Sequence, residues 1–473
     1  MNFEEIQTRK YIVILLIKEH FYIGLKYVII AANMVDGEHT GINREQHTKE
    51  AIAFEEEYAS LFFFARFSGR DTINVIPSFG INRIIRTTSA FISFCEARQS
   101  QGDTVIPLKI ALKHLRYVDT PHWKVGTPEE QLAMQLEALY VNRLCNPENQ
   151  DIYIGLAEVK TQLPNASIDD IAIVKLWENP QSNELDANKK LVLVSRWLPE
   201  ESGLDYRLKQ TVNVDQTVNI ESAWHSYLKD ITLSIAKMHK SLKSLSDEDA
   251  KKWGGIETLQ KKSERNLSEY DKAAKKLQEL GYAPEWLESF SEELHVTTDS
   301  IYQDKDFQEH IKERVQQKKI RRNHGDLKSA NIRLAEDWSQ DSGRKQWQKV
   351  VRMDVIDFEP LYCNIDDTSD ISMLVVDIEA RTGSSRLANR IKNYYLKLTS
   401  PKNRAAQATF PFYLVDKAIV CGYISILYDN DIELGLKFFE VAKNRLPELQ
   451  KQLKVQQGES VTVFEGSDHA VKV

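Results

Sequence analysis

Two short polar segments contain the residue types that phosphoryl transfer to a hydroxyl group requires. Residues 322–332 include Asp326 and Asn331 with four residues between them, and Asp357 follows later in the chain. An aspartate can orient an acceptor hydroxyl, while an asparagine oxygen and a second carboxylate can bind a metal ion. Magnesium needs few protein ligands when substrate phosphates complete its coordination. The pattern therefore predicts a magnesium-dependent phosphoryl-transfer site.

Each segment taken alone also has an ordinary structural interpretation. Residues 324–326 could form a simple turn, and Asp357 could be a carboxylate at the end of a strand, because short motifs often occur by chance. Together they carry more weight, since apolar runs flank both segments and the intervening residues 337–343 are rich in turn formers. This arrangement predicts a β-hairpin with the two acidic residues at its opposite ends.

The same residues resemble a known family. The His-Gly-Asp at 324–326 and the Ile-Asp-Phe-Glu at 356–359 are similar to motifs of the aminoglycoside phosphotransferase and choline kinase family, a small-molecule branch of the protein-kinase-like superfamily. That family usually has His-Gly-Asp-Leu-His in its catalytic loop. Lys328 replaces the last histidine here, and residues 326–331 are closer to a eukaryotic-type protein kinase. The resemblance is specific over residues 320–375 and diffuse elsewhere.

The resemblance implies a two-lobed α+β fold, with a small antiparallel sheet-rich lobe and a larger helical lobe, and the use of ATP and Mg²⁺. Asp326 would be the general base or acceptor-orienting group, and Asn331 and Asp357 would hold the metal. At Lys328 the sequence departs from the family, and we expect this lysine to neutralise charge on the transferring phosphoryl group. Asp370 would cap the following helix and brace the catalytic loop.

A lysine that contacts the nucleotide phosphates is expected at the end of the strand predicted at residues 105–113. Its last residues, Ile-Ala-Leu-Lys, resemble the Val-Ala-Ile-Lys of kinases. Lys109 and Lys113 lie four residues apart and share a face of the strand. The small Ala111 leaves room for an adenine ring beside Lys113, whereas Pro107 marks the edge or start of the strand before Lys109. We therefore assign the phosphate contact to Lys113.

A carboxylate partner for Lys113 is expected on a helix predicted at residues 128–144, whose leucines recur on one side. Glu137 is the first candidate and Glu130 the second. An ordinary surface glutamate is an equally good interpretation of Glu137, because such charges are usually exposed.

Residues 84–94 predict a hairpin whose tip, at 87–91, stands where kinases have a glycine-rich turn over the phosphates. Glycine is missing from this tip, so Ser89, Ala90 and Phe91 are the candidate nucleotide contacts. An ordinary hairpin is an equally good interpretation.

Two further strands are predicted at residues 171–177 and 191–198. The second runs into Pro199, where a hinge between the lobes is expected, and its last residues would face the adenine: Arg196, Trp197 and Leu198. Beyond the hinge, apolar residues from Trp224 to Leu242 recur at helical spacing and predict a buried stripe, beside which His239 is expected to be structural.

The composition places the chain among soluble globular proteins, with 473 residues, 42% hydrophobic and 28% charged. Its 62 basic and 69 acidic residues give a net charge of −7, which argues against nucleic acid as the main partner. Four cysteines without CxxC spacing predict neither disulfides nor a zinc site and favour a cytoplasmic location. The oligomeric state stays open.

The apolar run Tyr11–Asn33 is interrupted by charges at residues 18, 19 and 26. A spanning helix needs about 20 predominantly apolar residues, so a membrane association is not expected. The acidic start of the chain argues against a signal peptide. Translation from Met34 is an alternative.

The sequence predicts an N-terminal extension of unknown role at 1–75, a kinase-like N-lobe at 76–198 and a helical C-lobe at 199–455. A charged helical insertion is expected at 247–320, either as acceptor-binding surface or as a solvated hairpin without a role, and a flexible tail at 456–473.

The expected activity is ATP- and Mg²⁺-dependent phosphorylation of a hydroxyl on an unidentified small molecule. A protein kinase is the first alternative: Lys328 favours it, while Gly325, Glu359 and the lack of an Ala-Pro-Glu segment disfavour it. A nucleotide-binding pseudokinase is the second, supported only by the incomplete glycine-rich turn.

Overall fold

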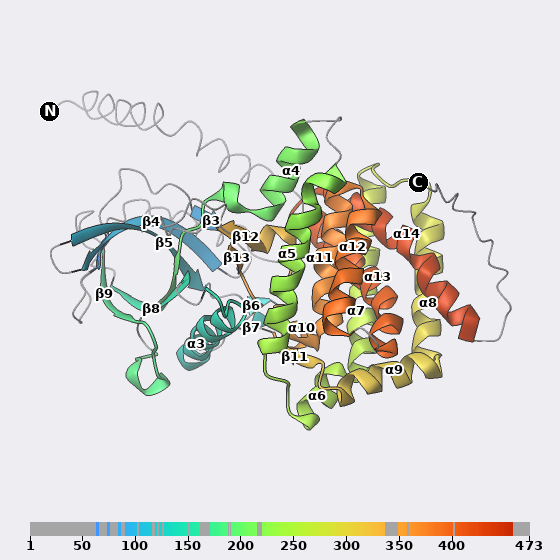
Figure 1. Ribbon diagram of the computed structural model, residues 1–473, viewed down its shortest axis with the longest axis horizontal. Coiled ribbons are helices and arrows are strands. Elements are labelled where there is room, and N and C mark those ends of the chain that lie inside the picture. Colours follow the sequence, from blue (N-terminus) through green and yellow to red (C-terminus); the bar gives the residue numbers. More distant parts are fainter. Residues whose placement is uncertain are drawn as a thin grey trace, which may run out of the picture. The chain divides into compact units, whose positions relative to one another are not determined.

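The described part of the computed structural model combines long helices with small, mainly antiparallel sheets (Figure 1). The structure describes residues 63–65, 73–75, 84–86, 90–101, 104–115, 119–120, 123–124, 127–149, 152–160, 171–187, 189, 191–214, 220–335, 349–356, 359–400 and 403–456. The apolar run at 11–33, the hairpin tip with Ser89, the metal-binding candidate Asp357 and the tail beyond 456 lie outside these residues.

The chain divides into two compact units, residues 1–116 with 157–176 and residues 117–156 with 177–473. This division does not test the lobe boundaries expected from the sequence, which stay a prediction.

In the first unit, a long antiparallel hairpin carries the predicted phosphate-contacting lysine. Strand β4 (Ala90–Gln101) pairs with β5 (Thr104–Leu115) along its whole length. Strand β3 (Ile84–Arg86) pairs with the start of β4, with Arg86 opposite Phe91, which confirms the hairpin predicted at 84–94.

Three further pairings belong to the same sheet. Strand β2 (Ile73–Val75) is antiparallel to the far end of β4. Strand β1 (Phe63–Ala65) runs parallel to β9 (Ile171–Trp177), which lies next to β8 (Tyr153–Lys160). The strand predicted at 171–177 is therefore confirmed.

The second unit begins with a small hairpin, β6 (Asp119–Thr120) and β7 (Trp123–Lys124), and the helix α3 (Pro128–Leu144). The helix predicted at 128–144 is confirmed, and its start has a physical cause. Thr127 Oγ1 accepts the Glu130 N–H at 3.3 Å, while Glu130 Oε2 accepts the Thr127 N–H at 2.9 Å. This capping box uses Glu130, the second candidate partner of Lys113, to begin the helix.

Short 3₁₀ turns η2 (Ser182–Glu184) and η3 (Glu200–Ser202) flank strand β10 (Leu191–Arg196). Helices then make up most of the unit: α4 (Leu204–Val214), α5 (Ile220–Ser241), α6 (Asp247–Gly254), α7 (Ile256–Glu279), α8 (Leu287–Gln303), α9 (Lys305–Gln316), α10 (Pro360–Cys363), α11 (Asp367–Thr382), α12 (Ser385–Thr399), α13 (Arg404–Leu427) and α14 (Ile432–Gln456). The segment predicted as a helical insertion, 247–320, is formed by α6 to α9 and the start of β11.

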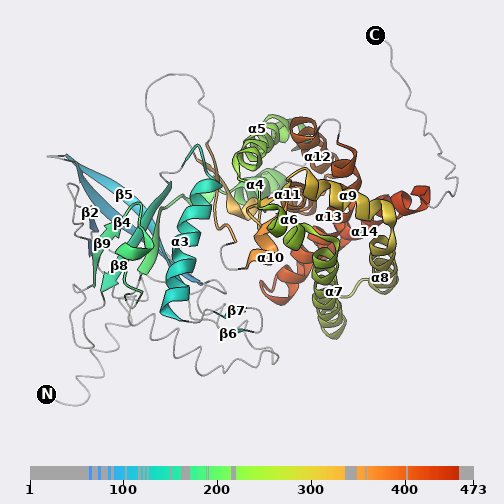
Figure 2. The same ribbon diagram turned by 90° about the horizontal axis from the view of Figure 1, so that it is seen from below.

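The core of this unit lies around α11 and α13. Helix α11 is buried along almost its whole length, and α13 packs against α7, α9, α11 and α14. Figure 2 shows α5 beside α12 and α12 beside α11. The predicted stripe of α5 is confirmed, because its apolar residues are all buried: Trp224, Leu228, Ile231, Ile235, Met238 and Leu242.

Helix α13 is also long and apolar enough to cross a membrane by length and composition. Among the described residues it is the single helix that meets this criterion, and 78% of its most apolar window is buried inside the protein. The central position of α13 accounts for its composition without a membrane.

Two small antiparallel pairs position the candidate site. Strand β11 (Ile320–Arg322) pairs with β14 (Asn364–Asp366), and β12 (Ile332–Ala335) pairs with β13 (Lys349–Arg352). The second pair confirms the predicted hairpin. Because its strands are antiparallel, the residues before β12 and after β13 lie at the same end of the hairpin, and not at opposite ends as expected.

Candidate active site

The predicted catalytic loop runs from β11 to the 3₁₀ turn η4 (Ser329–Asn331), and its two key residues are in direct contact. Asn331 Nδ2 donates to the backbone oxygen of Asp326 at 2.9 Å and to Asp326 Oδ2 at 2.7 Å. A backbone oxygen can only accept a hydrogen bond, so the hydrogen-bond network assigns the amide nitrogen of Asn331 to the side of Asp326. The nitrogen faces Asp326, and Oδ1 of Asn331 is the atom available to a cation.

Lys328 lies against the same carboxylate. Its Nζ is 3.3 Å from Asp326 Oδ2, and the side chains are 28% and 24% exposed, so a substrate can reach both. The negative charge of Asp326 raises the pKa of Lys328 above its usual value despite burial. Lys328 is therefore a cation at neutral pH. The other Asp326 oxygen, Oδ1, has no hydrogen-bond partner in the part of the chain that the structure describes.

His324 joins the catalytic loop to the segment that leads to the metal-binding candidate. Burial lowers the pKa of His324, so the ring is neutral. Its Nε2 donates to the Met353 oxygen at 2.9 Å, and Nδ1 accepts the Asp326 N–H at 3.3 Å. This histidine has both ring nitrogens occupied and acts as a structural link.

Helix α11 braces the loop through Asp370. The two carboxylate oxygens of Asp370 accept the N–H groups of His324 at 3.3 Å and Gly325 at 2.8 Å. His239 Nε2 lies 2.9 Å from the same carboxylate, and His239 Nδ1 lies 2.6 Å from Tyr395 Oη. Burial opposes the charge of Asp370, but the hydrogen bond from His239 and nearby charges hold its pKa below the usual value.

The expected bracing by Asp370 and the structural role of His239 agree with these contacts. The expectation that Asp370 caps the helix is wrong, because the cap is Asp366, whose Oδ1 accepts the Thr368 N–H at 2.7 Å. Asp366 also binds the buried Arg314 through two hydrogen bonds of 2.6 and 2.7 Å. Helix α11 begins four residues earlier than the cap assignment assumed, at Asp367.

A second α11 carboxylate supports the loop and was missed in the sequence. Asp377 Oδ2 accepts the Ser329 N–H at 2.7 Å, and Asp377 Oδ1 accepts from Arg381 Nε at 2.8 Å. Asp377 lies seven residues after Asp370, which is two helical turns and therefore nearly the same face. That spacing was the available signal.

The residues just before Asp357 are hydrogen-bonded to the catalytic loop. The Met353 N–H donates to the backbone oxygen of Asn331 at 2.7 Å, and the Ile356 N–H donates to the backbone oxygen of His324 at 3.0 Å. Asp357 is the next residue, outside the described part. The donor set that would surround a metal here, the Asn331 amide oxygen and carboxylates, consists of hard oxygens and fits Mg²⁺.

Glu137 on α3 has a partner that the sequence did not indicate. Its Oε1 lies 3.1 Å from Nε of Arg322, the last residue of β11 before the catalytic loop. The proposed pairing of Glu137 with Lys113 stays a prediction, because Lys113 lies in the other unit.

The predicted nucleotide contacts fall in two places. Arg196 ends β10 and is exposed, while Trp197 and Leu198 are half-buried, with Leu198 packed on a small core that includes Leu193. In the first unit, half-buried Lys113 is opposite Ile92 in the β4–β5 register. Phe91 is opposite His114 and the buried Ala111 is opposite Phe94, and Ala90 begins β4. Their nucleotide roles stay predictions.

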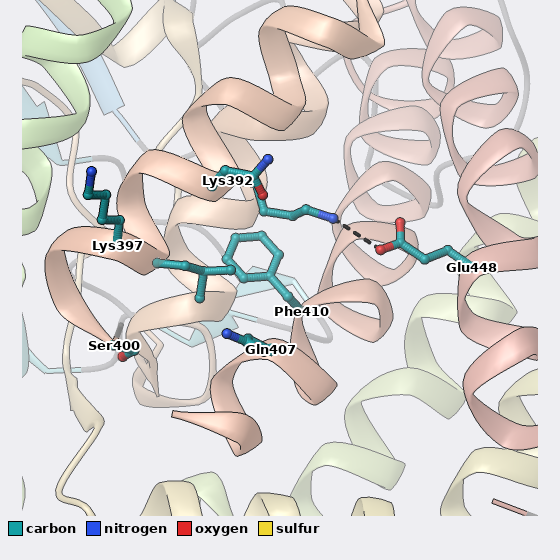
Figure 3. A pocket seen from close by; sticks show the side chains of 8 residues that line it. Lys392, Lys397, Ser400, Gln407, Phe410 and Glu448 are labelled. Atoms are coloured by element: carbon teal, nitrogen blue, oxygen red, sulfur yellow. Dashed lines mark hydrogen bonds and ion pairs between the residues drawn. The ribbon is translucent and has the colours of Figure 1, made fainter. Parts of the chain in front are cut away.

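A pocket elsewhere in the second unit has no connection to these residues. It lies between α12, α13 and α14, with a volume of about 390 Å³ (Figure 3). Lys392 Nζ is paired with Glu448 Oε1 at 3.0 Å on its wall. None of the predicted site residues lines it, so we assign it no chemistry: the lining residues are Lys392, Asn393, Leu396, Lys397, Ser400, Gln407, Phe410 and Glu448.

No protein-family model and no curated protein matches this sequence. Matching solved structures include an ethanolamine kinase of Plasmodium vivax, with 11% identity over 88% of this chain and 98% of that chain and a TM-score of 0.38. They also include a glucosamine kinase in complex with glucosamine, ADP and inorganic phosphate, with 13% identity over 87% of this chain and 84% of that chain and a TM-score of 0.39. At these TM-scores neither likeness assigns a fold or a substrate.

Proposed function

We propose that this protein is an ATP- and Mg²⁺-dependent phosphotransferase that moves the γ-phosphate to a hydroxyl of a small molecule, on a two-lobed kinase-like fold in the cytoplasm. The observation that supports it best is the contact of Asp326 with both Asn331 and Lys328. These three groups are an acceptor-orienting carboxylate, an oxygen ligand for a metal and a cation, the set that phosphoryl transfer needs.

Asp326 is prepared for an acceptor hydroxyl by its neighbours. Asn331 and Lys328 both hold Oδ2, at 2.7 and 3.3 Å, which fixes the carboxylate plane. Oδ1, which has no partner among the described residues, can then accept a hydrogen bond from the acceptor hydroxyl and orient the attacking oxygen.

Lys328 and Asn331 address the phosphate side of the reaction. The raised pKa of Lys328, caused by Asp326, keeps it charged over the whole neutral range, so it can stabilise negative charge on the transferring group. A bound Mg²⁺ would neutralise phosphate charge, and Asn331 Oδ1 with Asp357 would hold it. Lys113 would contact the nucleotide phosphates.

Two variants test this assignment by separate readouts. Asp357→Ala should abolish the Mg²⁺-dependent part of the thermal stabilisation by ATP, because a metal-binding carboxylate is lost. Asp326→Asn should keep ATP affinity near wild type while kcat falls by about 10²- to 10⁴-fold, the range for loss of a general base. Asp299→Ala, an exposed carboxylate on α8, is the control and should change neither readout.

The acceptor should be sought with labelled ATP and separate pools of small molecules and proteins. Transfer to the small-molecule pool supports the proposal, and transfer only to proteins replaces it with protein kinase activity. An unchanged Mg²⁺-dependent shift in Asp357→Ala would refute the metal assignment, and equal loss of ATP binding and turnover in Asp326→Asn would make Asp326 structural.

A further inference from the structure

The end of α3 holds the outer edge of β13 with asparagine side chains. Asn146 Oδ1 accepts the Arg352 N–H at 2.8 Å, and Asn146 Nδ2 donates to the Arg352 oxygen at 2.6 Å. Asn149 Nδ2 donates to the Val350 oxygen at 3.4 Å. Both asparagines are almost completely buried, so these bonds replace contacts with water.

The alternation of backbone groups along the strand explains this arrangement. In an antiparallel pair, alternate residues direct both backbone groups toward the same edge. Met353 N–H bonds Asn331 on the β12 side, so Arg352, the residue before it, faces the other edge. Val350 shares that edge. The side-chain amides of Asn146 and Asn149, just after α3, therefore satisfy the edge that a third strand would otherwise occupy.

Asn142 extends the same row toward the metal-binding candidate. Its Oδ1 accepts the Val355 N–H at 3.3 Å, two residues before Asp357, and Asn142 is 1% exposed. Its Nδ2 donates to the Ala138 oxygen of its own helix at 2.7 Å. The bond to Ala138 holds the Asn142 side chain in place on α3. Through Oδ1 of Asn142, the backbone N–H of Val355 is therefore tethered to α3.

The segment held in this way is conformationally strained. Asp354 has a φ of 58°, in the left-handed region that residues other than glycine seldom adopt. Such a residue persists only when its surroundings determine the backbone. The bonds on either side of it, from Met353 to Asn331, from Val355 to Asn142 and from Ile356 to His324, supply that constraint.

We infer that Asn142 is a positioning residue that sets the backbone leading into Asp357 and thereby the affinity for Mg²⁺ with nucleotide. The inference rests on the proposed function for its metal, but the backbone restraint can be measured without any ligand. Asn142 and Asn149 provide a matched pair, since both are buried and each makes one side-chain hydrogen bond to the backbone of residues 350–355. Asn142 accepts the Val355 N–H, and Asn149 donates to the Val350 oxygen. Of the two, Asn142 therefore bonds closer to Asp357 along the chain.

The experiment compares Asn142→Ala, Asn142→Ser and Asn149→Ala in the full chain. Serine within a helix can still donate to the Ala138 oxygen but is too short to reach Val355, so Asn142→Ser removes that bond with less damage to the helix. The first measurement is hydrogen exchange of the peptide covering 353–359. The second is the Mg²⁺ concentration that gives half of the thermal stabilisation by ATP.

The Asn142 variants should exchange faster at 353–359 and need about tenfold more Mg²⁺, the effect of losing one buried hydrogen bond. Asn149→Ala should lose stability with neither change. Equal exchange in all variants would overturn the inference, and so would faster exchange with an unchanged Mg²⁺ requirement. If the wild type shows no Mg²⁺-dependent binding, the proposed function and its metal are wrong and the affinity claim falls with them, while exchange alone then decides the backbone restraint.

Discussion

Gly325 is the position at which the catalytic loop has least room for a side chain. Its φ of +83° lies in the left-handed region, and an added Cβ would be 2.7 Å from the Tyr362 oxygen and 3.1 Å from Ile356 Cδ1. Gly383, at the end of α11, has a similar φ of +67° but nothing within 4 Å of an added Cβ. Alanine at the two positions separates backbone strain from steric conflict.

The two costs can be estimated. Alanine at a positive φ costs about 1–2 kcal/mol at either position. At Gly325 the backbone oxygen of Tyr362 must also move, and such overpacking adds about 1–3 kcal/mol. We therefore expect Gly325→Ala to lower the free energy of unfolding by about 2–5 kcal/mol and Gly383→Ala by about 1–2 kcal/mol.

Urea unfolding measures both changes in the free energy of unfolding, provided that the slope of this free energy against urea concentration is the same for the variants and the wild type. Turnover adds a second criterion, because the Gly325 N–H is bonded to Asp370 and the loop continues directly into Asp326. Gly325→Ala should lower kcat per folded molecule, and Gly383→Ala should not. Equal destabilisation at the two glycines, or full turnover in folded Gly325→Ala, would refute the reasoning.

Two further predictions concern lysines. Lys113→Met should lower kcat by about 10²-fold or more and spare the fold, because a donor that stabilises phosphate charge is lost. Lys109→Met should keep most of the activity. The reverse order in a turnover assay would move the phosphate contact to Lys109. Burial lowers the pKa of Lys262 to about 7 from its usual 10.5, with Lys417 adding to the effect. Between pH 7 and pH 10.5 the folded state then binds fewer protons than the unfolded state. The loss of folding stability caused by burying Lys262 is therefore largest below pH 7 and disappears as the pH rises toward 10.5. Lys262→Met should therefore stabilise the protein at pH 7 and flatten the rise in unfolding free energy up to pH 10; an unchanged slope in urea unfolding would contradict this.

The local parts of the site were predictable because short sequence spacing determines them. Asn331 follows Asp326 by five residues through a 3₁₀ turn, so their contact depends on one loop alone. The β12–β13 hairpin and the buried face of α5 likewise follow from apolar periodicity. These features needed no knowledge of the rest of the chain.

Contacts between distant segments were not predictable in the same way. Asn146 binds Arg352 across 206 positions, and nothing in the local pattern of either residue indicates the other. A buried asparagine at a helix end also fits many ordinary roles, such as bonding its own backbone. Glu137 shows the same limitation, because no local pattern indicated its contact with Arg322, which lies 185 positions away.

The two supports of the site differ in what they hold, and this difference follows from their chemistry. Asp370 is a buried carboxylate that accepts two backbone N–H groups of the loop carrying Asp326, with His239 hydrogen-bonded to the same carboxylate. Asn142 is a neutral amide that accepts one N–H on the other loop. Hydrogen bonds to charged acceptors are roughly twice as strong as neutral ones, so α11 constrains its loop more tightly than α3 does. If the proposed metal site is correct, the segment before Asp357 is therefore the part of the site that a small displacement of a helix alters most easily, and the proposed Mg²⁺ dependence is the property in which such a displacement would first be measured.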